Sequence, residues 1–337
     1  MRATIKDVAK KSGVSIATVS RAFNQCQKVD RQTRERILAV AGSLKYSPSA
    51  AARSLSTRRT ETIALLLPDL FGEFFSEIIR GVDEAVQGRG YHLVVSSSHN
   101  DRTEIAAALH TMRGRVDGLI VMSPNIDAET LNANLPLSLP VVLLNCQVDD
   151  DSFDALNIDN FQGSLEMVRH LIGHGHARIA IIKGNETNVD ANERLRGYHA
   201  ALAEAGLPRT PSYEVEGDFS EASGFSAVEN LLRIGQRPTA IFASNDSMAI
   251  GALSALRAQG ISVPSDIAMG SFDDIPVAKY LKPSLTTVSV NIHQLGKVAV
   301  ARLLDALDQR RGHARSRTHL STALVIRESC GCSSRQM

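Results

Sequence analysis

From residue 61 onward, short aliphatic runs alternate with amphipathic stretches, and this alternation limits the fold more than any other feature of the sequence. A short apolar run is typical of a buried strand, whereas stretches such as Phe75–Gly88 and Arg194–Ala205 carry apolar residues at helical spacing. Strands that alternate with helices form parallel sheets covered by helices, so we expect an α/β fold. The predicted strands are Thr62–Leu67, Tyr91–Ser96, Gly118–Met122, Val141–Leu144, Arg178–Ile182, Ala240–Ala243 and Ile267–Phe272.

The charge of the chain is divided unevenly. Residues 1–60 contain 13 Lys and Arg against 3 Asp and Glu, whereas residues 61–337 contain 24 against 33. A basic segment joined to an acidic one is typical of a nucleic-acid-binding module attached to a second domain. Charge alone leaves open the alternative of a solvated basic surface.

The sequence predicts a cytoplasmic protein that has no membrane partner. Apolar residues make up 43% and charged residues 22% of the chain, as in ordinary globular proteins. No apolar stretch follows the N-terminal charges, so a signal peptide is not expected. The aliphatic runs, such as Ile63–Leu67, are far shorter than the roughly 20 residues that a membrane helix needs.

Four cysteines are too few and too scattered for a disulfide framework, which indicates a reducing compartment. Cys330 and Cys332 form a C-x-C pair with no second cysteine or histidine pair beside it in the sequence, so no metal site is expected there. His174-Gly175-His176 is interpreted as a helix end rather than a metal-binding pair. We therefore expect no metal and no cofactor.

The first 46 residues have the pattern of a helix-turn-helix unit. Thr4 begins a helix with Asp7 three positions on, and Gly13 ends it. Ser15 begins a second helix whose inward face is Val19, Ala22 and Phe23. A tight turn between two closely packed helices is what this motif requires. A third helix, capped by Asp30, places Ile37, Leu38, Ala41 and Leu44 on one face.

The second helix of such a unit enters the major groove of DNA, with its early residues against base edges. Arg21 can form a bidentate contact with guanine, whereas Ile16 and Ala17 offer only apolar contact. Thr18 is expected at phosphate. The alternative for Arg21 is a solvated charge without a DNA contact. Together with the linker discussed next, the predicted DNA-binding residues are Thr4, Ser15, Ile16, Ala17, Thr18, Ser20, Arg21, Asn24, Arg53 and Leu55.

Residues 47–60 form a predicted hinge. Ser47 can cap a helix, Pro48 suits its first position, and the alanines that follow favour helix. The segment is shorter than the roughly 12–15 residues that an isolated helix needs, so we expect it to fold only on DNA. Leu55 lies among basic residues and suits an apolar wedge in the minor groove. A linker without a DNA role is the alternative.

The segments ATIKDVAKKSGVSIATVSRAFN and YSPSAAARSLSTRRTETIALLLPD resemble the lactose-repressor/galactose-repressor (LacI/GalR) family. The resemblance continues through VDGLIVM, IDNFQGS, ERLRGYHAAL, PTAIFASNDSMAIGAL, VPSDIAMGSFDDIP and LVIRES. It implies a homodimer on a near-palindromic operator, with the hinge segments paired in the minor groove. Ile16, Ala17 and Arg21 match the base-contacting positions and are similar to the galactose-repressor branch. No leucine heptad follows Ser329, so a dimer rather than a tetramer is expected.

The same resemblance implies a two-lobed domain of the type I periplasmic-binding-protein fold over residues 61–337, after an all-α headpiece at 1–46 and the hinge at 47–60. Lobe 1 is expected at about 61–159 and 291–319, and lobe 2 at about 160–290 and 320–330. The chain thus crosses between lobes near residues 160 and 290 and again after a helix at about 292–309.

Ligands of such sheets bind at the carboxyl ends of the strands. The polar and aromatic residues there, which also match the family's effector-contacting positions, are Phe74, Phe75, Asn145, Arg194, Phe219, Asn245 and Asp273. Aromatic rings, an arginine and a carboxylate suit a sugar. Three alternatives stay open: Asn245 as a helix cap, Asp273 or Asp274 as a turn residue, and Phe75 as core. Cys146 stands where some relatives carry a large aromatic side chain. Stacking of a ligand ring from that side is therefore less favoured, and so is a purine effector.

We therefore predict a DNA-binding transcriptional regulator, a repressor of a carbohydrate-utilisation operon that is controlled allosterically by a small sugar or sugar phosphate. A purine- or nucleoside-responsive repressor of the same family is the alternative. A sugar-binding transport receptor shares the fold but lacks a basic N-terminal segment. No enzyme is expected, because the sequence has no G-x-S-x-G elbow, phosphate-binding glycine loop or H-E-x-x-H motif.

Overall fold

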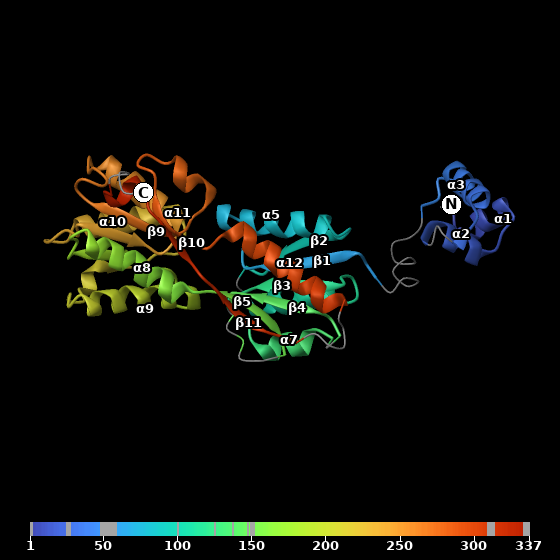
Figure 1. Ribbon diagram of the computed structural model, residues 1–337, viewed down its shortest axis with the longest axis horizontal. Helices are drawn as coiled ribbons and strands as arrows, with labels where there is room; N and C mark the ends of the chain where they lie inside the picture. The colour runs from blue at the N-terminus through green and yellow to red at the C-terminus, as the bar shows by residue number, and fades with distance from the viewer. Residues whose placement is uncertain are drawn as a thin grey trace. The chain divides into compact units, whose positions relative to one another are not determined.

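The computed structural model describes residues 3–24, 28–47, 59–99, 101–124, 126–136, 138–146, 148, 152–308 and 314–332. The chain forms two compact units (Figure 1). The first consists of Met1–Thr62 with Gly114–Asp117, and the second of Ile63–Arg113 with Gly118–Met337. The predicted hinge residues Arg53 and Leu55 lie outside the described residues.

Within its described residues, the first unit contains the helices α1 (Ile5–Ser12), α2 (Ile16–Asn24) and α3 (Arg31–Ser43). Each begins where the sequence predicts, and α1 also ends at the predicted residue. Thr4 and Asp7 form a capping box at α1, Gly13 ends it in the left-handed conformation, and the hydroxyl of Ser15 accepts a hydrogen bond from the Thr18 amide at the start of α2.

The three helices pack around one small core, formed by Val8, Ala9, Val19, Ala22, Ile37 and Ala41. Leu38 was expected on the inward face of α3, and this prediction is wrong: its side chain is 38% exposed. Because successive helical residues are rotated by about 100°, Leu38 turns out of the core once Ile37 and Ala41 are directed into it.

The first lobe of the second unit is a six-stranded sheet in the order β11-β5-β4-β3-β1-β2. The pairs β1–β3, β3–β4, β4–β5 and β5–β11 are parallel, and among the predicted strands this confirms the expected parallel sheet. Helices α5 and α12 pack together, with α12 against β3 and β4, and α6 packs on α7 (Figure 1). The bounds are β1 Thr62–Leu67, α5 Glu73–Gln87, β2 His92–Ser97, α6 Arg102–Met112, β3 Gly118–Met122, α7 Ala128–Asn134, β4 Val141–Leu144, β5 Asp154–Ile158, α12 Ile292–Asp308 and β11 Arg317–Leu320.

The second lobe is another six-stranded sheet, in the order β12-β10-β9-β8-β6-β7. Its pairs are parallel except β10–β12, which is antiparallel and was not expected. Helices α8 and α9 pack together, as do α10 and α11. The bounds are α8 Asn160–Gly173, β6 Ile179–Ile182, α9 Val189–Glu204, η2 Pro211–Tyr213, β7 Glu214–Val215, α10 Glu221–Leu232, β8 Ala240–Ala243, α11 Asp246–Ala258, β9 Ala268–Asp273, η3 Pro276–Tyr280, β10 Thr286–Ser289, β12 Ala323–Val325 and η4 Glu328–Cys330.

The chain passes between the lobes three times, between β5 and α8, between β10 and α12, and between β11 and β12. The fold is therefore the expected α/β pair of lobes after an all-α headpiece. Several strands lack an aliphatic run and were not predicted, among them β5, which contains Asp154 and Asn157, and the edge strand β11. Within the described residues, no helix is both long and apolar enough to span a bilayer.

Candidate nucleic-acid interface and ligand pocket

Helix α2 has one buried face and one exposed face. Val19 and Ala22 are fully buried against α1 and α3, whereas Ile16, Ala17 and Arg21 are exposed on the opposite side. Ile16 is 43% exposed, although burial of a large aliphatic side chain is favourable. An exposed aliphatic residue and an arginine on one helix face form a surface suited to base edges in a major groove.

The other predicted DNA-binding residues of the headpiece lie around the start of α2. Thr4 and Ser15 are exposed, and Thr18 and Ser20 are half-buried. The Thr18 hydroxyl lies 2.9 Å from that of Ser15, so these two side chains hold the first turn of α2 in place. Asn24 ends α2, but its side chain lies outside the described part of the structure, as do Arg53 and Leu55.

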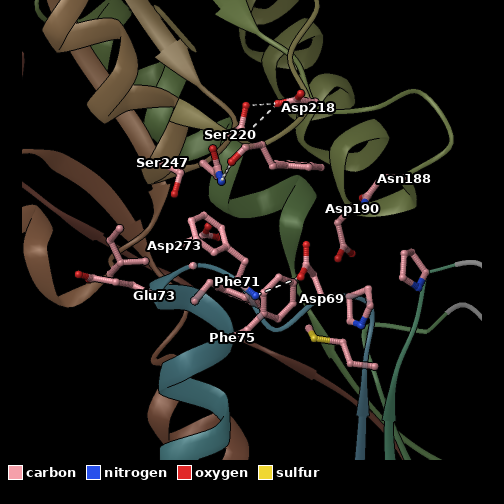
Figure 2. Close-up of a pocket in the computed structure, with 18 of the residues that line it drawn as sticks. Asp69, Phe71, Glu73, Phe75, Asn188, Asp190, Asp218, Ser220, Ser247 and Asp273 are labelled. Carbon is pink, nitrogen blue, oxygen red and sulfur yellow. Dashed lines mark hydrogen bonds between the residues drawn. The ribbon is translucent and has the colours of Figure 1, made fainter. Parts of the chain in front are cut away.

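A pocket of about 280 Å³ lies between the two sheets of the second unit (Figure 2). All seven residues that the sequence singled out for a ligand line this pocket: Phe74, Phe75, Asn145, Arg194, Phe219, Asn245 and Asp273. Most of them come together because they follow the carboxyl end of a parallel strand or begin a neighbouring helix, whereas Arg194 lies in the second turn of α9. Whether they contact a ligand stays a prediction.

The first lobe contributes aromatic residues. Phe74 and Phe75 form an edge-to-face pair with ring centroids 5.4 Å apart at the start of α5. Phe75 packs against the core, as the alternative interpretation predicts, and it also lines the pocket. Asn145 accepts a hydrogen bond from the Ile158 amide (2.8 Å) through its side-chain oxygen, which fixes the amide at the end of β4.

Cys146, next along the chain, does not line the pocket. It is 1% exposed, and its thiol contacts the Ser123 amide (3.3 Å) and the Leu144 carbonyl (3.2 Å). Burial raises the pKa of this thiol to about 12, so it stays protonated. The aromatic side of the pocket is therefore supplied by phenylalanines from other segments.

The second lobe places a buried arginine at the base of the pocket. Arg194 is 4% exposed; its guanidinium donates to Asn160 (2.8 Å) and to the Ser244 carbonyl, and lies 3.9 Å above the Phe272 ring. Arg194 lies within α9, which begins at Val189 after the cap Asn188, whereas the predicted helical stretch began only at Arg194. The α9 cap was missed because Asn188-Val189-Asp190 was not taken as a helix start.

Carboxyl groups outnumber cations in this pocket. Arg194 is the sole Lys or Arg among the described lining residues, which include Asp69, Glu73, Asp190, Asp218, Glu221 and Asp273. Burial raises the pKa of the Asp273 carboxyl to about 8, against the opposing effect of Arg194. Burial likewise raises the pKa of Asp190 to about 6. Sequence reasoning missed Asp190, which lines the pocket and accepts a hydrogen bond from Asn160 (2.8 Å).

Three lining residues, Asn145, Phe219 and Asp273, have φ angles of +47°, +71° and +111°. Such left-handed backbone costs about 1–3 kcal/mol for a residue other than glycine and persists where the surroundings impose it, often at ligand sites. The Phe219 ring lies directly over Gly184, where any Cβ would stand 2.2 Å from Cζ of the ring. Gly184 therefore fixes where this aromatic side chain enters the pocket.

The alternative interpretation of Asn245 is correct: it caps α11 by accepting from the Met248 amide (2.9 Å). Its amide nitrogen donates to the Phe219 carbonyl (3.1 Å), so both polar ends already have protein partners. The turn before Pro276 is held instead by Asp246, which accepts from the Ile275 amide (2.8 Å), while Asp274 pairs with Arg327 at 2.6 Å. Asp273 is thereby left directed at the pocket (Figure 2).

A basic helix-turn-helix unit joined to a two-lobed domain with a buried polar pocket defines a ligand-responsive DNA-binding regulator. Residues 4–49 match the family described as bacterial regulatory proteins, lacI family, and residues 168–330 match the periplasmic binding protein-like domain. This chain belongs to the lacI family and is a DNA-binding transcriptional regulator.

Similar proteins match along nearly the whole chain. The HTH-type transcriptional repressor PurR of Photobacterium profundum is 35% identical over 97% of this chain and 98% of its own length. The ribose operon repressor of Haemophilus influenzae is also 35% identical, over 97% and 98%. The solved structure of the lac repressor dimer bound to operator and the anti-inducer ONPF is 30% identical, covers 98% of this chain and 99% of its own, and has a TM-score of 0.83.

Proposed function

We propose that this regulator is a repressor that binds a near-palindromic operator as a homodimer, and that a small uncharged sugar in the pocket controls its DNA affinity. The observation that carries the ligand assignment is the acidic, partly aromatic lining around the buried Arg194–Asp273 pair. The dimeric, operator-bound lac repressor and the ribose operon repressor, which this chain resembles, support the operator and the sugar class.

The charge of the lining favours an uncharged ligand over a sugar phosphate. A phosphate in this pocket would meet the carboxylate of Asp190, whose pKa of about 6 leaves it mostly ionised at neutral pH, and a single guanidinium that is already bonded to Asn160 and Ser244. Asp273, with a pKa of about 8, is mostly protonated there and adds no full negative charge. Like charges at close range in a buried site cost several kcal/mol, on the order of what a charge-assisted hydrogen bond contributes or more. Sugar hydroxyls, by contrast, donate to carboxylates and accept from arginine.

The size of the pocket favours a compact ligand. Ligand sites commonly measure about 300–1,000 Å³, and this pocket, at about 280 Å³, is slightly smaller than that range. One sugar ring against Phe74 or Phe75 on one side and Phe219 on the other suits both the volume and the aromatic lining. Nucleosides and purine bases belong in the test as the competing class.

The coupling to DNA is proposed to pass through the angle between the lobes. Lining residues come from both lobes, and the Val277 amide of lobe 2 donates to the Glu73 carboxylate of lobe 1 (3.1 Å) beside the pocket. We expect a ligand that changes the angle between the lobes to alter the separation of the two hinge segments in the dimer. These segments are proposed to fold together on DNA at only one separation. Couplings of about 1–3 kcal/mol between two sites are typical.

We also infer that the pocket binds its ligand without transforming it and that the protein acts in the cytoplasm, where its operator is accessible. The relatives named above are transcriptional regulators, which supports both inferences. Recovery of an unchanged sugar after prolonged incubation with the protein is the expected result.

The test has two stages. Selection from random duplexes is expected to recover an inverted repeat, and affinity for it should fall about 10³–10⁵-fold between 50 and 200 mM salt if each dimer contacts roughly 6–10 phosphates. Sugars, sugar phosphates and nucleosides are then screened by thermal shift, and hits are added to the operator complex. A hit confined to nucleosides, or no preference for any duplex, would contradict the proposal.

A further inference from the structure

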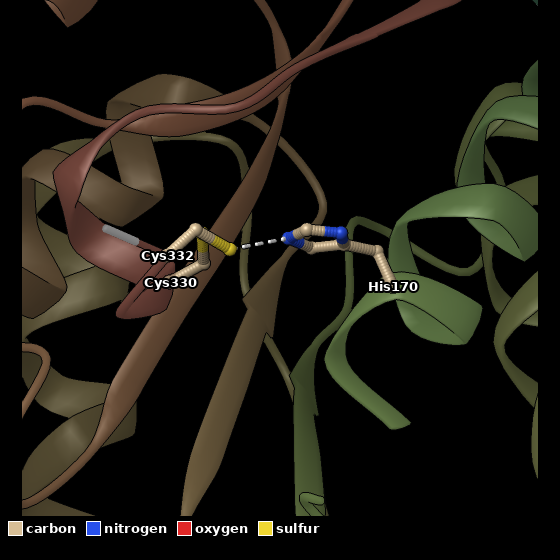
Figure 3. Close-up of side chains that lie close together, drawn as sticks. All are labelled: His170, Cys330 and Cys332. Carbon is tan, nitrogen blue, oxygen red and sulfur yellow. Dashed lines mark hydrogen bonds between the residues drawn. The ribbon is translucent and has the colours of Figure 1, made fainter. Parts of the chain in front are cut away.

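Away from the pocket, four side chains with sulfur or imidazole donors converge at one end of the second lobe. The Sγ atom of Cys332 lies 3.0 Å from Sγ of Cys330, 3.4 Å from Nε2 of His170 and 3.0 Å from Nε2 of His174. The donor atoms of His170, Cys330 and Cys332 all lie within 4.8 Å of one another (Figure 3). The expectation that no histidine pair lies beside the C-x-C pair holds in the sequence but is wrong in space.

Local structure brings each pair of donors to the same side. His170 and His174 are four residues apart at the end of α8, so they lie on one helix face, with ring centroids 4.6 Å apart. Gly331, between the cysteines, has a φ angle of +85°, which turns the chain back so that both thiols reach the same point. Residues other than glycine rarely adopt this backbone conformation.

The two segments are held firmly where they meet. Ser329, within the short helix η4, is fully buried, donates to the Met269 carbonyl of β9 (2.7 Å) and accepts from the Thr286 amide of β10 (2.8 Å). Cys330 is 2% exposed, whereas His170 and Cys332 are half-buried and His174 is exposed. The site therefore has a rigid inner side and an outer side from which an ion can enter.

The donor separations are close to those around a tetrahedral zinc ion. Bonds of about 2.3 Å to sulfur and 2.0–2.1 Å to nitrogen place neighbouring donors roughly 3.4–3.8 Å apart. The separations of 3.0–3.4 Å between Cys332 and the other three donors require these atoms to move apart by only a fraction of an ångström. His174 is not among the donors that all lie within 4.8 Å of one another, so its exposed ring must also turn toward His170 and Cys330. Thiolate and imidazole ligands select zinc or copper(I) over magnesium or calcium.

We propose that one transition-metal ion, preferably zinc, is bound by Cys330, Cys332, His170 and His174. This ion would link the C-terminal segment to α8. The sequence pattern is C-x-C together with H-x₃-H, and the site is separate from both the DNA-contacting helix and the ligand pocket. Binding releases the thiol protons, because the metal ligand is the thiolate. An ion bound to the folded chain but not to the unfolded one raises the melting temperature.

The test uses the full-length protein, purified under reducing conditions without chelators. Elemental analysis is expected to find one zinc ion per chain, and cobalt(II) substitution should give the absorption of tetrahedral thiolate coordination. The single variants Cys332→Ser and His174→Gln, both at partly or fully exposed positions, should weaken zinc binding at least about 100-fold in competition with a chelator, since even supporting residues outside the ligand shell contribute about 10–100-fold.

Two matched controls lie nearby. His176→Gln removes a histidine two residues from His174 whose ring contacts the Thr239 hydroxyl (3.2 Å), and Cys146→Ser removes a buried thiol of the other lobe. Neither should change zinc affinity. Zinc should raise the melting temperature of the wild type and not of Cys330→Ser/Cys332→Ser. Less than about a tenth of an ion per reduced chain, a Cys330–Cys332 disulfide in its place, or equal affinity in all variants would overturn the proposal.

Discussion

The guanidinium of Arg194 lies 3.3 Å from a carboxylate oxygen of Asp273, with both side chains almost fully buried at the base of the pocket. The two residues come from α9 and the end of β9, far apart in the sequence. No hydrogen bond within the described structure satisfies that oxygen of Asp273. A ligand hydroxyl at this point would therefore complete a buried polar cluster that the protein alone leaves incomplete.

Arg194→Ala is expected to abolish the response to the effector while operator binding persists at low temperature. Because the change leaves the buried acceptors on Asn160 and Ser244 without their donor, the free energy of unfolding should fall by about 3 kcal/mol, on the order of what unsatisfied buried polar groups cost. Arg196→Ala, two residues on, removes a side chain that is 63% exposed and pairs with Glu193; it should change the free energy of unfolding by less than about 1 kcal/mol. Equal loss of operator binding and effector response in Arg194→Ala would contradict the assignment.

Asp273→Asn should change how stability depends on pH. The folded Asp273 holds its proton up to a pKa of about 8, whereas the unfolded one releases it near 3.8, so the folded state binds more protons between these values. Stability of the unliganded protein should then fall as pH rises from about 4 to about 8, by at most about 1.4 kcal/mol per pH unit from this group.

In Asp273→Asn this part of the decline is absent, and the variant should be the more stable protein at pH 8. Urea unfolding at several pH values measures the effect. Asp83→Asn, at an exposed position on α5, is the control and should follow the wild type. Parallel curves for Asp273→Asn and wild type would show that Asp273 does not carry the extra proton.

Arg21→Ala should weaken operator binding by about 1–3 kcal/mol, or roughly 5–150-fold, because one bidentate base contact is lost. Binding to unrelated duplexes should change only a few-fold. Arg31→Ala provides the control, since Arg31 is equally basic and exposed but stands at the start of α3 and pairs with Glu35 at 2.9 Å. Fluorescence anisotropy on operator and scrambled duplexes distinguishes the two, and an equal loss on both duplexes for Arg21→Ala would exclude base contact.

Gly184→Ala is expected to weaken effector binding at least about 10-fold without weakening operator binding. A Cβ at this position would stand 2.2 Å from the Phe219 ring, so the ring must leave its place in the pocket. Gly235→Ala is the matched control, because a Cβ there meets no atom within 4 Å. Calorimetric titration with the sugar identified by screening measures both variants. Unchanged affinity in Gly184→Ala would show that Phe219 does not contact the ligand.

Much of the pocket could be predicted because one topological rule governs it. In parallel sheets the carboxyl ends of strands share an edge, so Phe219 and Asp273 can be expected together in the second lobe. Asn145 can likewise be expected at the carboxyl edge of the first-lobe sheet, which lines the other side of the pocket. The same rule cannot say which polar side chains the protein uses itself. Asn245 has the position of a ligand-binding residue but both ends of its amide are bonded to Met248 and Phe219.

Most of the other features that the sequence did not predict also depend on packing between distant parts of the chain. The strands β5 and β11 pair with each other although about half of the chain separates them, and their burial depends on neighbours rather than on their own composition. Arg194 belongs to α9 because the helix begins at the cap Asn188. The polar residues around Asn188 hide this cap in the sequence. The meeting of His170 with Cys332 depends on tertiary packing between segments that no local pattern connects.

The three passages between the lobes have a consequence for synthesis of the protein. Helix α12 and strand β11 belong to the first lobe, yet they follow nearly all of the second lobe in the sequence, and β12 of the second lobe comes later still. Domains that are continuous in sequence can fold one after another as they leave the ribosome. Here the aliphatic face of α12, including Leu295, Val300 and Leu303, is missing from the first lobe until about nine-tenths of the chain has been translated. The nascent chain must therefore keep the part of the first lobe that α12 later covers, on α5, β3 and β4, from aggregating until this helix has been translated.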